Sequence, residues 1–104
     1  YVWGGTNPNT GADCSGFVQY VMRNAAGVSL PRTSREQAKV GRSIKSSEML
    51  PGDLIFYANS GGTVNHVAMY IGNGQIVHAA SRKSGIKIST WNYRSPKTIR
   101  RVLN

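Results

Sequence analysis

The sequence predicts an α+β fold in which one helix packs on an antiparallel β-sheet. Residues 14–26 carry apolar side chains at helical spacing, whereas from residue 54 the chain changes to short β-branched and aromatic segments that are typical of strands. Glycine-rich turns separate those segments, which favours hairpins. A helical part followed by a strand part indicates α+β and not an alternating α/β architecture.

The helix predicted over residues 14–26 has a signal at each end. Asp13 can cap its N-terminus, and Gly27 can end it in the left-handed conformation. Residues 1–12 are rich in glycine and turn formers and predict a loop. The apolar positions form one unbroken stripe: Cys14, Phe17, Val18, Val21, Met22, Ala25 and Ala26.

The rest of the chain predicts shorter elements. A turn at Leu30-Pro31 precedes a second helix from Ser34 to Val40, which Gly41 ends. A further turn at Pro51-Gly52-Asp53 leads into the strands. Strands are predicted at Leu54–Tyr57, Val64–Ile71 and Gln75–Ala80, with weaker ones near Ile86–Ile88 and Ile99–Leu103.

Length and charge limit the classes of function. A chain of 104 residues suits one compact monomeric domain, and because it starts at Tyr1 without Met we expect 1–104 to be excised from a longer secreted protein. The net charge of +9 favours polyanions, and nucleic acid, anionic lipid headgroups and acidic cell-wall polymers are all possible partners. The basic residues are scattered without interleaved aromatics, which disfavours nucleic acid. No apolar run approaches the ~20 residues of a membrane span.

The one cysteine and two histidines fall where nucleophilic catalysis needs them. Cys14 lies in the first turn of the helix, where free N–H groups favour a thiolate, although Asp13 opposes this. A three-residue loop at Gly72–Gly74 would place His66 opposite Ala80, and His78 diagonal to His66 on one sheet face. We expect that face to contact the helix, with His66 as base and His78 orienting it.

Two other interpretations of these residues remain open. They could be buried structural side chains, or they could bind zinc. The 52-residue separation of Cys14 and His66, the lack of a second cysteine and the lack of an HExxH motif disfavour a metal. We rank the nucleophile first, structural residues second and a metal third, and no cofactor is required.

Four motifs together resemble the NlpC family of papain-like cell-wall peptidases. They occur in the family's order and cover nearly the whole chain, and Tyr1, Gly4 and Gly5 resemble the family's opening Tyr-x-x-Gly-Gly. The motifs are Asp13-Cys14-Ser15-Gly16-Phe17-Val18, Leu30-Pro31-Arg32-Thr33-Ser34 with Gln37, Pro51-Gly52-Asp53-Leu54-Ile55-Phe56, and His66-Val67-Ala68-Met69-Tyr70-Ile71-Gly72.

The resemblance implies a papain-like α+β fold, a catalytic triad of Cys14, His66 and His78, and a secreted enzyme of the bacterial cell wall. It implies cleavage of peptidoglycan stem peptides after γ-D-glutamyl and before the diamino acid. Substrate contacts would come from Tyr1, Asp13, Ser15 and Arg35, with Arg32 as the alternative arginine. An acyltransferase or amidase with the same triad, or a non-catalytic wall-binding module, are the rival functions.

Overall fold

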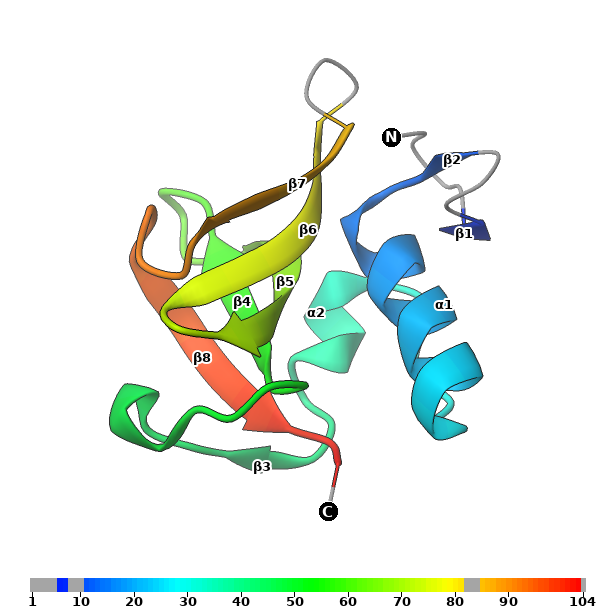
Figure 1. Ribbon diagram of the computed structural model, residues 1–104. Helices are drawn as coiled ribbons and strands as arrows, with labels where there is room; N and C mark the ends of the chain where they lie inside the picture. The colour runs from blue at the N-terminus through cyan, green and yellow to red at the C-terminus, as the bar shows by residue number, and fades with distance from the viewer. Residues whose placement is uncertain (1–5, 8–10, 82–84, 104) are drawn as a thin grey trace.

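The computed structural model describes residues 6–7, 11–81 and 85–103, and it confirms the α+β class. Both helices lie on one side of a six-stranded sheet in which every pairing is antiparallel (Figure 1). The strand order is β3-β8-β4-β5-β6-β7. The elements are β1 Thr6–Asn7, β2 Gly11–Ala12, α1 Cys14–Ala26, α2 Ser34–Gln37, β3 Arg42–Ser43, a 3₁₀ turn at Ser46–Glu48, β4 Leu54–Ala58, β5 Val64–Gly72, β6 Gln75–Ser81, β7 Gly85–Thr90 and β8 Pro96–Arg101.

Helix α1 has the predicted bounds because both caps form. Asp13 is extended, and its Oδ1 accepts a hydrogen bond of 2.8 Å from the Gly16 N–H. Gly27 adopts φ 66°, and its N–H donates to the Arg23 carbonyl. These local contacts fix where the helix starts, and therefore fix Cys14 as its first residue.

Helix α2 is shorter than the predicted Ser34–Val40. The Thr33 side chain caps it, but after Gln37 the chain continues in tighter bonds from Lys39 N–H to the Glu36 carbonyl and from Val40 N–H to the Gln37 carbonyl. Gly41 then reverses the chain at φ 73°. A Cβ at Gly41 would lie 2.3 Å from the Arg101 carbonyl oxygen, so only glycine fits.

The strand predictions hold for β4, β5, β6 and β7, but five other elements differ. The segment predicted as a loop before Asp13 contains the short β1–β2 hairpin, and β3 and the 3₁₀ turn were not predicted. The last strand, β8, starts at Pro96 and ends at Arg101, so it lies earlier than the predicted 99–103. Its partner β4 is distant in sequence, and such pairings have no local signal.

The β5–β6 hairpin has the predicted register, but its loop is not the predicted one. Gly72 pairs with Gln75, so the loop is the two residues Asn73 and Gly74, both with positive φ. Ile71 is the extra residue of a β-bulge, after which Tyr70 pairs with Ile76 and Met69 with Val77. The bulge compensates for the shorter loop, so His66 and His78 still share a face.

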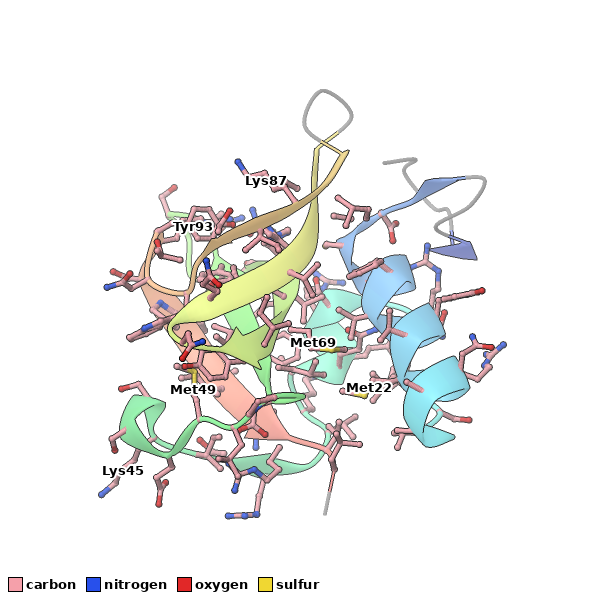
Figure 2. The ribbon with its side chains drawn as sticks, viewed as in Figure 1. Met22, Lys45, Met49, Met69, Lys87 and Tyr93 are labelled. Carbon is pink, nitrogen blue, oxygen red and sulfur yellow. The ribbon has the colours of Figure 1, made fainter. Side chains whose placement is uncertain are left out.

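Both faces of the sheet are buried, and this overturns one prediction. In Figure 2, Met22 and Met69 lie between α1 and the sheet. Val67 belongs to the same core as α1, whereas Ala68 belongs to the second core on the opposite face. His66 alternates with Val67, so its face does not pack on the helix as expected. Residues 54–57 of β4 are wholly buried, so their pattern could not distinguish the two faces.

Candidate active site

Cys14 contacts the edge of β5 on both sides of His66. Its Sγ lies 4.0 Å from the Asn65 carbonyl oxygen, and the Val67 backbone is near enough to lower the pKa of the thiol. Asn65 is the extra residue of a bulge, because Tyr57 pairs with His66 and Ala58 with Val64. The recorded β5–β6 pairs end at Met69–Val77. The thiol therefore lies against the part of β5 beyond its last pair with β6, at residues that flank His66 in the sequence.

The two histidine side chains lie within hydrogen-bond distance of each other. His66 Nε2 lies 2.7 Å from His78 Nδ1, and the other nitrogen of His78, Nε2, lies 3.0 Å from the Ser89 hydroxyl. Both imidazoles are buried. His66 Nδ1 has no hydrogen bond to any residue that the structure describes. If His66 carries its proton on Nε2, it donates to His78, and His78 then donates to Ser89, which leaves Nδ1 of His66 as a base.

The site rests in its neutral form. Burial raises the pKa of the Cys14 thiol, and the Asp13 charge raises it further, although backbone hydrogen bonds from Val67, Ser15 and Cys14 oppose the rise. Burial, with help from His78 and Arg94, lowers the pKa of His66 to about 3. Burial and then Lys87 lower the pKa of His78. The N–H groups at the helix start lower the pKa of the Cys14 thiol, as predicted, but burial raises that pKa by more.

Arg94 and Tyr93 form the side of the site away from the helix. The Arg94 Nη2 donates to the Ala58 carbonyl at 2.9 Å and to Asn65 Oδ1 at 3.2 Å, so it holds both strands at the bulge. Its guanidinium lies 5.6 Å from the centre of the Tyr57 ring. Tyr93, labelled in Figure 2, has its ring 5.4 Å from that of His78. This turn thus places a cation and an aromatic ring beside the histidine pair.

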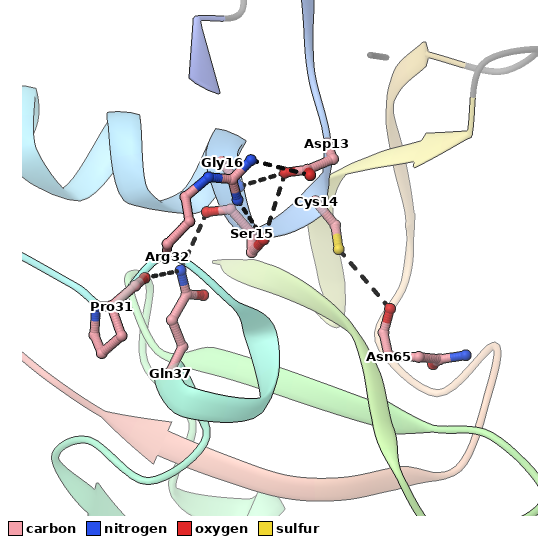
Figure 3. A network of polar contacts seen from close by, with 8 residues as sticks. All are labelled: Asp13, Cys14, Ser15, Gly16, Pro31, Arg32, Gln37 and Asn65. Atoms are coloured by element: carbon pink, nitrogen blue, oxygen red, sulfur yellow. Dashed lines mark hydrogen bonds and ion pairs between the residues drawn. The ribbon is translucent and has the colours of Figure 1, made fainter. Parts of the chain in front are cut away.

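A network of polar side chains lies beside Cys14 at the start of α1 (Figure 3). Arg32 donates to Asp13 Oδ2 at 3.1 Å and to the Ser15 hydroxyl at 2.9 Å. Asp13 also caps α1 through its other oxygen. Gln37 is fully buried, and its amide nitrogen donates to the carbonyls of Ser15 and Pro31, at 3.1 and 2.8 Å. Gln37 therefore fastens the Leu-Pro turn to the start of α1.

An open cleft of about 580 Å³ lies over this network. Arg32 forms the contacts with Asp13 and Ser15, whereas Arg35, the arginine named from the sequence, is exposed on the cleft wall. Tyr1 lies outside the described residues. The cleft residues are Asp13, Cys14, Ser15, Arg32, Thr33, Ser34, Arg35, Thr63, Val64 and Asn65.

Ser89 and Arg94 are among the site residues that were missed from the sequence. Ser89 is in a strand whose pairing with β6 brings it beside His78, and a register prediction for residues 75–90 would have placed it there. Arg94 lies in an irregular turn whose position depends on β8, so it had no sequence signal. Among the described residues there is no cluster of three His, Cys, Asp or Glu side chains able to hold a metal, and no helix is long and apolar enough to span a membrane.

The free thiol at a helix start and the buried histidine pair stand on a fold that known proteins share. The sequence pattern of the NlpC/P60 family matches residues 1–102. The chain belongs to the NlpC/P60 family. A Bacillus cereus NlpC/P60 family protein of known structure superposes with a TM-score of 0.92 at 34% identity, over 100% of this chain and 35% of that one. The NlpC/p60 domain of the peptidoglycan hydrolase SagA gives 0.85 at 34% identity, over 97% and 85%.

Curated relatives of this NlpC/P60 chain carry peptidase names. It is 46% identical to the Escherichia coli murein DD-endopeptidase MepS/murein LD-carboxypeptidase, over 85% of this chain and 46% of that protein. It is 44% identical to the Bacillus subtilis bifunctional muramidase/DL-endopeptidase CwlT, over 86% of this chain and 27% of that protein. The chain thus spans between about a quarter and a half of these two relatives. The match confirms the family and the papain-like α+β fold predicted from the sequence.

Proposed function

We propose that this chain is a peptidoglycan endopeptidase that cuts stem peptides after γ-D-glutamyl and before the diamino acid. The main support is the placement of a thiol on the strand edge around His66, whose ring is oriented by His78 at 2.7 Å. The names DL-endopeptidase and gamma-DL-glutamyl hydrolase, which two relatives carry, support the proposed cleavage site. We extend the proposal to a secreted location in the cell wall, where that substrate occurs.

The proposed chemistry uses the neutral resting pair. His66 Nδ1 takes the Cys14 proton while its Nε2–H donates to His78, and the thiolate attacks the scissile carbonyl carbon. The backbone N–H of Cys14, at the start of α1, can donate to the oxyanion. His66 then gives the proton to the leaving amine, which leaves a thioester on Cys14. A water molecule, deprotonated by His66, hydrolyses the thioester and restores the thiol.

The proposed substrate contacts follow from the charges of the cleft. A peptide joined through the γ-carboxyl of D-glutamate keeps its α-carboxylate, which suits Arg32 or Arg35 on the cleft wall. Asp13 and Ser15 lie beside Cys14 and suit a free amino end, with Tyr1 as a further contact. We favour Arg32 for the carboxylate because its position is fixed by Asp13 and Ser15.

Mass spectrometry of purified stem peptides after incubation with this chain tests the proposal. We expect fragments that end in D-glutamate and fragments that begin with the diamino acid, and none from Cys14→Ala. EDTA should leave the rate unchanged, because no metal takes part. Fragments joined to an added amine would indicate acyl transfer, and an inert protein that still sediments with cell walls would indicate a binding module.

A further inference from the structure

A second pocket adjoins the catalytic cleft and carries an excess of positive charge. It has a volume of about 530 Å³ and shares Arg35, Thr63 and Val64 with the cleft, so the two form one continuous depression. Three parts of the chain that are distant in sequence line it: α2 and the residues after it, the start of β5, and β8. The pocket therefore exists only in the folded chain.

Four cations and one carboxylate line this pocket. The cations are Arg35, Lys39, Lys97 and Arg100, and the carboxylate is Glu36. Neither ion pair between described residues, Arg32 with Asp13 and Arg101 with Asp53, involves any of them. Glu36 accepts a hydrogen bond from the Thr33 hydroxyl at the helix cap. The pocket thus keeps a formal excess of three positive charges.

Local geometry gathers these cations in one place. Arg100 is held there because its Nε donates to the Ala38 carbonyl at 2.8 Å, which leaves its other N–H groups available. Lys97 is the extra residue of a bulge in β8, because Phe56 pairs with Thr98 and Tyr57 with Pro96. A bulge re-aims the side chain that it carries. Here the Lys97 Nζ lies 4.0 Å from the Cβ position of Gly62, in the β4–β5 turn beside the pocket.

We propose that this pocket binds a phosphodiester polyanion of the cell wall and thereby holds the wall beside the catalytic cleft. Three excess charges exceed what a single peptide carboxylate would neutralise, so a repeating anion fits better. Arginine and lysine both suit phosphate oxygens. The sequence suggested that the basic residues are scattered, whereas the fold collects four of them in a pocket that adjoins the cleft. The polymer would be a partner of the proposed wall hydrolase, but its binding to the pocket does not depend on catalysis.

The test measures binding of a fluorescent poly(glycerol phosphate) fragment to the Cys14→Ala protein by anisotropy, at several salt concentrations. We expect Lys39→Gln/Lys97→Gln to weaken binding on the order of tenfold and to flatten the salt dependence. The control is Arg42→Gln/Lys45→Gln, which removes the same charge from residues outside the pocket, and should weaken binding at most about twofold. Lys45 is labelled in Figure 2, away from the helices.

Three results would overturn the inference. Equal weakening by both double variants would mean that diffuse surface charge binds the polymer. Equally tight binding of poly-L-glutamate of matched length would mean that phosphodiesters are not preferred. Absence of binding at low salt would exclude the site altogether. Cleavage of a small soluble muropeptide by the corresponding variants with Cys14 intact should be unchanged, which separates failure of this site from failure of the proposed peptidase activity.

Discussion

Replacing Arg101 with methionine should destabilise the fold. Arg101 donates to both carboxylate oxygens of Asp53, at 2.9 and 2.8 Å, and to the Glu48 carbonyl at 2.8 Å. The two side chains are only 15% and 3% exposed. The substitution leaves the buried Asp53 carboxylate without its cation. Because Arg101 itself is partly exposed, we expect the cost of a buried acceptor that loses its partner, about 1–3 kcal/mol. A domain of this size is stable by about 5–15 kcal/mol, so a measurable part of the stability would be lost.

Urea unfolding followed by circular dichroism measures this cost, and the melting temperature should fall by roughly 4 °C or more. The double variant Asp53→Asn/Arg101→Met should recover most of the loss. The amide can still accept the 2.8 Å bond from the Leu50 N–H, and no charge remains buried. Arg42→Met, on the exposed neighbouring strand, controls for the loss of a cation and should cost under about 0.5 kcal/mol.

Two results would refute this reasoning. One is a cost below about 1 kcal/mol for Arg101→Met, since a pair worth so little would behave as an exposed ion pair. The other is a double variant as unstable as the sum of the two single variants, because independent losses would show that the two side chains are not coupled.

Three further predictions concern the catalytic site. Ser89→Ala should lower kcat about tenfold or more with little change in KM, because His78 loses the acceptor that sets its tautomer. Ser89→Thr should restore the rate, and an unchanged kcat in Ser89→Ala would show that Ser89 does not orient the histidine pair. Asp13→Asn keeps the helix cap but loses the charge, so KM should rise more than kcat falls while the urea midpoint stays close to wild type; a fall in kcat alone would assign Asp13 to the chemistry. Burial lowers the pKa of His66 from 6.5 to about 3, so below pH 6.5 the unfolded chain binds a proton that the folded chain does not. The free energy of unfolding should therefore drop progressively from pH 6.5 towards pH 3, and it should drop less in His66→Gln; parallel curves for the two proteins would contradict the shift.

Local signals made α1 and the histidine pair predictable. The Asp13 and Gly27 caps act within a few residues of the helix ends, so a sequence contains all that is needed to find them. The relation of His66 to His78 depends on one hairpin. The loop was predicted with three residues and has two, but the bulge at Ile71 adds the missing residue, so the predicted pairing of the strands is correct. The catalytic roles of Cys14, His66 and His78 themselves stay predictions.

Features that depend on distant pairings were not predictable. Leu54 and Ile55 are equally buried but belong to different cores, so the run of apolar residues in β4 cannot show which face meets the helix. The choice between Arg32 and Arg35 depends on how the Leu-Pro turn meets α1, which Gln37 decides through two buried hydrogen bonds. Arg94 reaches the site only because β8 pairs with β4.

The two structural roles of Asp13 limit how this cleft can diverge. One carboxylate caps the helix that starts at the nucleophile, and it also fixes Arg32 beside Ser15. A lineage that needed different substrate contacts could not change this residue freely, because alanine would cost about 0.5–2 kcal/mol of helix stability as well as releasing the arginine. New specificity is therefore expected to arise first at Thr63, Val64 and Arg35, which line the cleft without supporting the helix.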